Sequence, residues 1–176
     1  MKVRTARFGI LEIEANMIIE FPKGIPGFER LRRFFMLPVE GAENIRWLQA
    51  VDEPAVALLI IDPFKYYQGY SCDVPDQIAG ELEIKESAEA LVLTAVTVPP
   101  DNPAAATANL VAPIIINTRL RKGRQVILSG SPYSTRHNLF QEIKSPAGRD
   151  RTGKVSEPAG DTPPDTAKKV SGKGGV

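Results

Sequence analysis

The sequence is poor in the residues on which most small enzymes and metal sites depend. Its 176 residues include one cysteine, Cys72, and one histidine, His137. A single cysteine excludes an internal disulfide, and a single histidine excludes a multi-histidine or Cys/His zinc site built within one chain. Because catalysis by cysteine or histidine would rest on these two residues alone, the composition favours a binding module over an enzyme. We expect neither a cofactor nor a bound metal.

The chain also lacks a dominant charge and a long hydrophobic run. Its formal net charge is +1, which argues against a uniformly basic nucleic-acid binder. The longest apolar stretch, residues 55–61, is far shorter than the roughly 18 residues that a membrane-spanning helix needs. Residues 1–8 are charged and do not have the apolar centre of an export signal. We therefore expect a cytoplasmic protein that makes no membrane contact.

The last 32 residues differ in composition from the rest. Residues 145–176 hold 10 of the 29 Gly and Pro residues of the chain, and no aromatic residue, Leu or Ile. Such a segment cannot bury enough apolar area to offset the entropy of ordering its backbone. We predict one folded domain, residues 1–144, followed by a disordered Gly/Pro-rich tail, residues 145–176. The tail carries a net charge of +2, which leaves −1 for the predicted domain.

The predicted domain consists of short, β-branched segments separated by Gly and Pro. Such spacing is typical of an antiparallel sandwich or barrel. We predict a mainly β fold, a small antiparallel β-barrel-like domain with one or two short helices, one of them at residues 75–82. We expect Gly123 to supply the positive φ of a hairpin turn. The candidate strands are residues 3–8, 11–14, 17–21, 33–39, 45–51, 56–61, 91–98, 114–117 and 125–128.

Three stretches resemble a known family. They are residues 21–29 (FPKGIPGFE), residues 47–54 (WLQAVDEP) running into 60–64 (IIDPF), and residues 107–117 (TANLVAPIIIN) continued by 123–128 (GRQVIL). Their order and separation, from about residue 2 to residue 140, are similar to those of the flagellar assembly factor FliW family. The tail has no counterpart in that resemblance.

The resemblance implies a small, barrel-like cytoplasmic protein without enzymatic activity that binds two protein partners. One is CsrA, a dimeric RNA-binding translational repressor, and the other is flagellin, the filament subunit. A bound member of the family stops CsrA from repressing flagellin mRNA, and cytoplasmic flagellin takes that member away again. We accordingly expect a chaperone-like partner switch that is a monomer when free and does not bind nucleic acid directly.

Six residues are predicted to bind a partner. Two lie in the loop of residues 21–29, where two glycines and two prolines favour a rigid, presented backbone. Two are tyrosines of residues 64–70, because four aromatics in seven residues cannot all face one core and Tyr is favoured at interfaces. Two belong to the acidic stretch of residues 52–89, which would attract a basic partner. The six are Phe28, Glu29, Tyr66, Tyr67, Asp73 and Asp76.

Each feature also has a plainer interpretation. The loop of residues 21–29 could only connect strands, and the acidic residues could form solvated faces. The basic residues between positions 119 and 124 could contact phosphate or form a solvated hairpin tip. His137 follows Ser134 and Thr135, but no nucleophile-elbow motif surrounds the serine. The alternative function is an RNA-binding or other small β interaction module unrelated to flagella.

Overall fold

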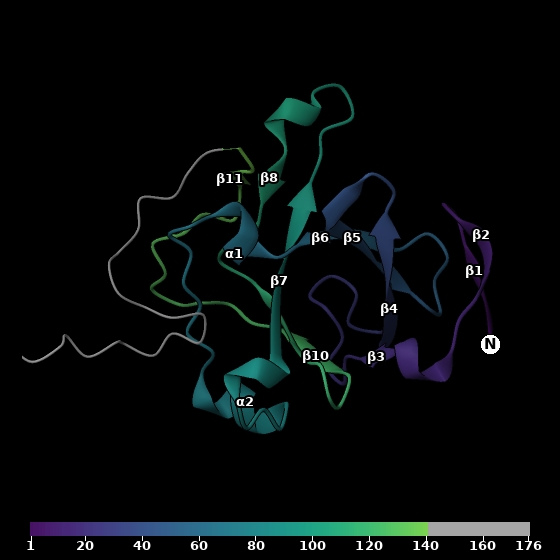
Figure 1. The fold of residues 1–176 in the computed structure, drawn as a ribbon, viewed down its shortest axis with the longest axis horizontal. Coiled ribbons are helices and arrows are strands. Elements are labelled where there is room, and N and C mark those ends of the chain that lie inside the picture. The colour runs from purple at the N-terminus through teal and green to yellow at the C-terminus, as the bar shows by residue number, and fades with distance from the viewer. Residues whose placement is uncertain (141–176) are drawn as a thin grey trace, which may run out of the picture.

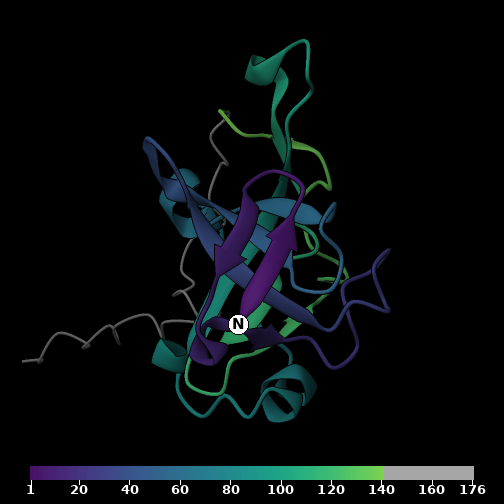
Figure 2. The same cartoon turned by 90° about the vertical axis from the view of Figure 1, so that its right-hand side faces the viewer.

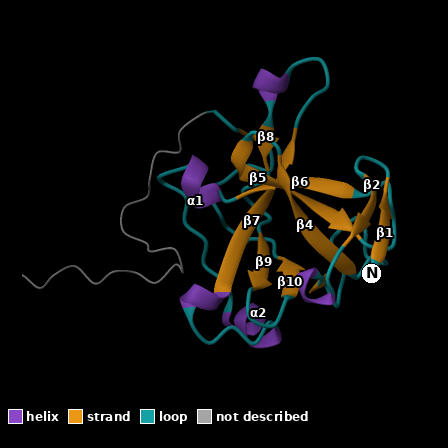
Figure 3. Ribbon diagram, turned by 45° about the vertical axis from the view of Figure 1, so that its right-hand side comes forward, coloured by secondary structure: helices purple, strands orange, loops and turns teal. Residues whose placement is uncertain are grey.

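A computed structural model describes residues 1–140 of the chain. Most of them form a β-barrel whose strands fill the centre of the molecule, while short helices lie at its periphery (Figures 1 and 3). The predicted tail, residues 145–176, lies outside the described residues. The seven barrel strands are β3 (Ile19–Glu20), β4 (Arg33–Val39), β5 (Ala42–Ala50), β6 (Ala57–Ile61), β7 (Ala90–Thr97), β9 (Ile114–Asn117) and β10 (Lys122–Gln125).

The barrel closes through β7. The strands follow the order β7, β6, β5, β4, β3, β10, β9, and a further pairing joins β9 back to β7. The first half of β7 pairs with β9, with Leu93 opposite Ile114, and its second half pairs with β6, with Leu59 opposite Val96. Closure leaves no open edge in this ring. The predicted β-barrel-like fold is therefore confirmed, although one pairing, between β3 and β10, is parallel.

Two smaller pairs of strands surround the barrel. Strands β8 (Thr107–Ala108) and β11 (His137–Asn138) extend the sheet beyond the end of β7. Strands β1 (Lys2–Thr5) and β2 (Gly9–Glu12) form a separate hairpin, which lies over the outside of the barrel (Figure 2). The short helices are η1 (Ala15–Met17), α1 (Pro63–Tyr66), α2 (Asp76–Glu81), η2 (Ser87–Glu89) and η3 (Pro103–Ala105). None of the helices within residues 1–140 is long and apolar enough to cross a membrane.

Three apolar clusters hold these parts together. The barrel interior is filled by side chains such as Phe21, Phe34 and Ile60, all at 0% exposure. A second cluster, which includes Tyr67 and Cys72, joins the segments after β6 and β10 to the outside of the barrel. The third packs Val3 and Ile13 of the hairpin region against Phe35 and Val51. Neighbouring residues of β4, Phe34 and Phe35, thus face two different cores, as the two-residue period of a strand requires.

The structure corrects several local predictions. Strand β10 occupies Lys122–Gln125 rather than residues 125–128, and β8, β11 and α1 were not predicted. Gly123 does not supply a positive φ; the turn before β10 has it at Arg121, with φ 55°. Gly123 is instead a site of close approach, because a Cβ there would lie 2.6 Å from Cζ of Phe21. The predicted helix at residues 75–82 is present as α2.

Candidate protein-binding site

The segment between β6 and β7 contains four of the six predicted partner-binding residues. It begins with α1, where Asp62 caps the helix by accepting a hydrogen bond from the Phe64 N–H at 3.0 Å. Pro63 occupies the first turn, where its missing N–H costs nothing. The helix ends at Tyr66, and the chain then turns inward. The two tyrosines at this turn, Tyr66 and Tyr67, therefore have different environments.

Tyr67 is buried, with 1% of its surface exposed. Its hydroxyl donates to the Asn138 carbonyl at 3.3 Å, and its ring meets His137 edge-on at 5.1 Å. Burial raises the pKa of Tyr67 to about 12. The prediction that Tyr67 offers exposed aromatic surface is wrong, because the ring covers the edge of β11, an element that sequence reasoning missed. Tyr66 is partly exposed, and burial raises its pKa as well.

Tyr70 and Tyr133 fix the chain that follows α1. Their rings lie 4.8 Å apart, and the Tyr70 hydroxyl donates to the Leu110 carbonyl at 3.2 Å. The Tyr133 hydroxyl accepts a hydrogen bond from the Ser71 N–H at 2.8 Å. Tyr133 was not predicted as a site residue, since a lone tyrosine in a Ser/Pro-rich stretch gives no signal. These contacts hold the segment that carries Asp73 against the loop that carries Tyr133.

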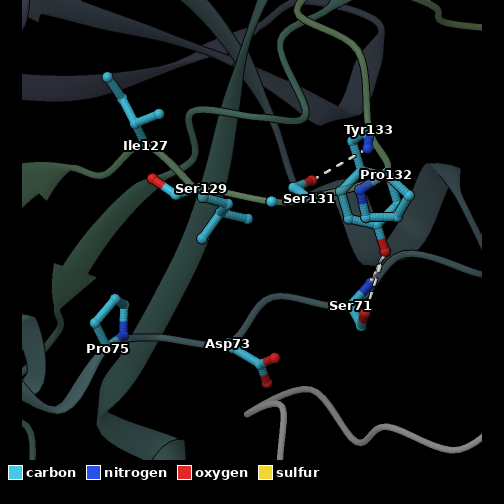
Figure 4. Close-up of a pocket in the computed structure, with 10 residues that line it drawn as sticks. Ser71, Asp73, Pro75, Ile127, Ser129, Ser131, Pro132 and Tyr133 are labelled. Carbon is cyan, nitrogen blue, oxygen red and sulfur yellow. Dashed lines mark hydrogen bonds between the residues drawn. The ribbon is translucent and has the colours of Figure 1, made fainter.

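A cleft of about 580 Å³ lies between these two segments. Figure 4 shows Asp73 and Pro75 on one side and Ile127 with the loop up to Tyr133 on the other. The Ile127 side chain is 68% exposed, and Asp73 is exposed and is the one charged side chain among the residues that line the cleft. The volume is within the usual range of ligand sites. Its lining combines apolar surface with a single negative charge.

Most of the acidic stretch is engaged within the chain itself. Glu81 pairs with Lys23 at 3.1 Å and also with Arg124, and Glu89 pairs with Arg119 at 2.8 Å. The Lys122 ammonium lowers the pKa of Glu83 through a direct hydrogen bond. The basic cluster at positions 119–124 thus faces the acids that follow α2. Neither group forms the free charged surface that sequence reasoning allowed.

The loop of residues 21–29 has the positive φ values that its glycines allow. Gly24 has φ 68°, and a Cβ there would lie 2.6 Å from the Glu29 Cα. Glu29 is exposed, and its carboxylate accepts a hydrogen bond from the Gly27 N–H at 2.8 Å, which lowers the pKa of Glu29. Phe28 is half-buried. The Lys23–Glu81 ion pair ties this loop to α2, whereas Tyr66 lies on α1.

The candidates for catalysis and metal binding are not assembled into a site. Cys72 has 0% exposure, and burial raises the pKa of its thiol to about 12, so the thiolate is disfavoured. His137 lies against the buried Tyr67 ring. Within residues 1–140, no group of three or more His, Cys, Asp or Glu side chains is placed to hold a metal ion.

The comparisons of this chain with known proteins agree with one another. A family model described as "FliW protein" matches residues 2–139. The protein named "Flagellar assembly factor FliW" of Moorella thermoacetica is 49% identical over 142 residues, which cover 81% of this chain and 90% of that protein. The protein of the same name from Thermosipho africanus is 40% identical over 146 residues, covering 81% of this chain and 100% of the relative. A solved structure, "Crystal structure of the flagellar assembly factor FliW", superimposes with a TM-score of 0.76 at 37% identity, covering 81% of this chain and 99% of that chain.

Proposed function

This chain belongs to the FliW family of flagellar assembly factors, and from that membership we propose that it adjusts flagellin synthesis by binding two proteins in turn. The first is CsrA, whose repression of flagellin mRNA the bound chain relieves. The second is flagellin, which displaces CsrA in the cytoplasm and is held as by a chaperone. The match of the family model over residues 2–139 carries the proposal. The chain acts here by binding alone, without catalysis.

The acidic wall of the cleft is the surface that we propose for CsrA. Asp73 lines the cleft and Asp76 lies in the first turn of α2, three residues further on. Both side chains are exposed. An RNA-binding protein has a basic surface, and complementary charge across an interface raises the rate of association more than the affinity. Glu81, Glu83 and Glu89 form ion pairs with Lys and Arg of this chain, and we assign the attraction of CsrA to the acids beside the cleft.

We propose that binding leaves the RNA groove of CsrA accessible and weakens RNA binding indirectly. A protein that mimics RNA needs a dense acidic surface, yet Glu81, Glu83 and Glu89 are neutralised by ion pairs. A gel-shift series with purified CsrA and flagellin mRNA tests this. We expect the effect of the chain to saturate as RNA is raised. A linear rise of its apparent Kd with RNA concentration would instead show direct competition.

We propose that flagellin binds to apolar surface of this chain. Tyr67 is buried, so Tyr66 on α1 is the candidate binding residue of that segment. Phe28 and Glu29 form a second candidate surface. Amphipathic helices of an unassembled filament subunit have apolar faces that need cover, and aromatic side chains suit that purpose. Removing a central interface aromatic commonly costs about 2 kcal/mol, or roughly thirtyfold in affinity.

Titration calorimetry with purified flagellin tests this assignment. We expect Tyr66→Ala to weaken binding by roughly thirtyfold and Tyr66→Phe to change it little, because the second variant keeps the ring. Phe28→Ala examines the other candidate surface in the same assay. If both alanine variants bind flagellin as the native chain does, the proposed flagellin surfaces are wrong. If the native chain itself binds neither flagellin nor CsrA, the proposed function fails.

A further inference from the structure

The hairpin of β1 and β2 is firmly anchored on its inner face and open on its outer face. Val3 and Ile13 are 2% and 4% exposed and pack against Phe35 of β4 and Val51, which follows β5. The side chains that alternate with them point away from the barrel and are exposed. Figure 2 shows the two strands side by side on the surface. The hairpin is thus a fixed surface element with few constraints on its outer side.

The hydrogen-bond pattern shows which backbone groups of β2 face away from β1. The Met1 ammonium donates to the Ile13 carbonyl at 2.6 Å, and the Ile13 N–H donates to the Met1 carbonyl at 2.9 Å. Bonded and non-bonded pairs alternate along an antiparallel ladder. Met1 and Ile13 form a bonded pair, so the next pair along the ladder, Lys2 with Glu12, is non-bonded. The same holds two positions further on, where Arg4 is opposite Ile10. The N–H and C=O groups of Ile10 and Glu12 therefore point outward.

No hydrogen bond within residues 1–140 reaches these outward groups of β2. The outer strand of the larger sheet, β11, is protected. On β11, the outward Asn138 carbonyl accepts from the Tyr67 hydroxyl, and the Asn138 side chain accepts from the Phe140 N–H at 2.9 Å. An open edge is a template for pairing with another chain, so natural proteins usually cover or charge it.

The side chains also distinguish the two edges of the hairpin. The edge of β1 has Lys2 and Arg4, and charged residues of this kind discourage strand pairing. The same edge is tied down where the Ala6 N–H donates to the Pro54 carbonyl at 2.9 Å. The edge of β2 instead presents Ile10, with 64% of the residue exposed, together with one charged residue, Glu12, which lies opposite Lys2. An unpaired backbone edge with an exposed apolar side chain is an arrangement that accepts an added strand.

We propose that the β2 edge binds an extended segment of a protein partner by strand addition. The occupant pairs antiparallel to β2 and exchanges backbone hydrogen bonds with Ile10 and Glu12. A β-branched apolar residue of the occupant lies opposite Ile10, and a basic residue two positions earlier lies opposite Glu12, since directly opposed side chains on one face interact most strongly. The recognised pattern is basic–x–β-branched. This site is separate from the cleft that is proposed for CsrA.

The proposal can be tested with short peptides and the full-length, ¹⁵N-labelled chain. The probe is the acetylated and amidated peptide Ser-Lys-Thr-Val-Thr. In NMR titrations we expect the amide signals of Ile10 and Glu12 to shift most. A peptide with N-methylated valine cannot donate to the Ile10 carbonyl, and we expect it to bind roughly tenfold more weakly. A peptide with Glu in place of Lys is expected to bind several-fold more weakly, since it opposes Glu12 with a like charge.

Two variants of one residue separate the backbone edge from the side chain. Glu12→Pro removes the outward N–H but no bond to β1, whereas Glu12→Ala removes the carboxylate and keeps the N–H. We expect the peptide to bind Glu12→Ala several-fold more weakly and Glu12→Pro more weakly still. If Glu12→Pro disturbs the hairpin, the methylated peptide still decides the question on the native chain. Equal binding of both peptides would overturn the proposal, as would shifts centred elsewhere. Shifts of Ile10 and Glu12 that depend on protein concentration alone would assign the edge to a second copy instead.

Discussion

Two acidic regions in the same connecting segment use charge in opposite ways. Near the end of α2 and beyond it, Glu81, Glu83 and Glu89 are paired with basic side chains from the loop before β4 and from the hairpin of β9 and β10. Near the start of α2, Asp73 lines a cleft in which no Lys or Arg takes part. The first region fastens the molecule to itself, whereas the second lies at a cleft on the surface. Local density of acidic residues therefore does not indicate which carboxylates a partner can reach.

The self-paired region depends on a buried amide, so removing that amide should have the largest effect on stability. Asn117 has 0% exposure, and its side chain donates to the Leu82 and Glu83 carbonyls at 2.9 and 3.1 Å. It also accepts from the Arg119 and Leu120 N–H groups at 2.9 and 3.0 Å. We expect Asn117→Ala to lower the free energy of unfolding by about 2–4 kcal/mol, since buried polar groups lose their partners.

Chemical denaturation of Asn117→Ala and of a matched control measures this effect. Asn16 is exposed, and its side chain donates one hydrogen bond to the Glu14 carboxylate at 3.0 Å, so Asn16→Ala should change stability by less than about 0.5 kcal/mol. If Asn117→Ala lowers the free energy of unfolding by less than about 1 kcal/mol, the hydrogen bonds of this amide do not stabilise the region as proposed.

Gly123 controls how closely β10 packs on the barrel core beside the same region. A Cβ at this position would lie 2.6 and 2.7 Å from two ring atoms of Phe21, which is fully buried and has little room to move. We expect Gly123→Ala to lower the free energy of unfolding by about 1–3 kcal/mol, the usual cost of overpacking. Gly80→Ala serves as the control, because no atom lies within 4 Å of the added Cβ in α2. It should be neutral or stabilise by up to about 1 kcal/mol, and equal losses in the two variants would contradict the assignment.

The barrel was predictable because its strands carry their own local signals. Strands β4 and β9 have the predicted bounds, since each is a β-branched or aromatic run ended by a turn. The turn conformation of residues 21–29 was predictable for a similar reason, as its glycines allow the positive φ values of 68° and 87° at Gly24 and Gly27. The two-residue strands β8 and β11 gave no such signal, because their pairing depends on the end of β7.

The candidate site was only partly predictable, because exposure depends on contacts between distant residues. Asp73 was found from its charge, but the cleft beside it is formed with residues 127–133, more than fifty positions later. Tyr67 was misplaced for the same reason, since its partner Asn138 is 71 residues away. The pairing of Glu83 with Lys122 spans 39 residues. None of these separations leaves a periodic pattern that a single sequence would reveal.

Acid should loosen the self-paired region. Lys122 lowers the pKa of Glu83, and the Lys85 N–H with Arg119 lowers that of Glu89, both from an ordinary value of 4.5. A carboxyl whose folded pKa is lowered stabilises the fold above its unfolded pKa, and this stabilisation is lost as pH falls through the folded pKa. We expect the melting temperature to fall between about pH 5 and pH 3. The fall should be smaller in the variant Glu83→Gln/Glu89→Gln, which is already less stable at neutral pH.

Melting curves at three pH values check this, with Glu86→Gln as the control. Glu86 is exposed and forms no ion pair within the described part of the chain. Because both paired carboxylates are at the surface, the shift should amount to only a few degrees. If the double variant and the control lose stability with acid as steeply as the native chain does, the ion pairs do not fasten this region.

The smallest expected effect concerns the outward-facing acids and is kinetic. If the Asp73 side of the cleft attracts CsrA, then Asp73→Asn/Asp76→Asn should slow association about three- to tenfold at low salt, and the difference should vanish near 0.5 M salt, where screening is nearly complete. The variant Glu81→Gln/Glu83→Gln changes the net charge equally, but it removes acids whose field is already cancelled by Arg124 and Lys122. It should therefore slow association less, because a charge cancelled by a neighbouring ion pair adds little to the field that steers a partner at long range. Stopped-flow measurements of both variants over a salt series compare the two regions directly. Equal slowing would show that net charge alone matters, and rates that do not change with salt would remove the electrostatic role of Asp73 and Asp76.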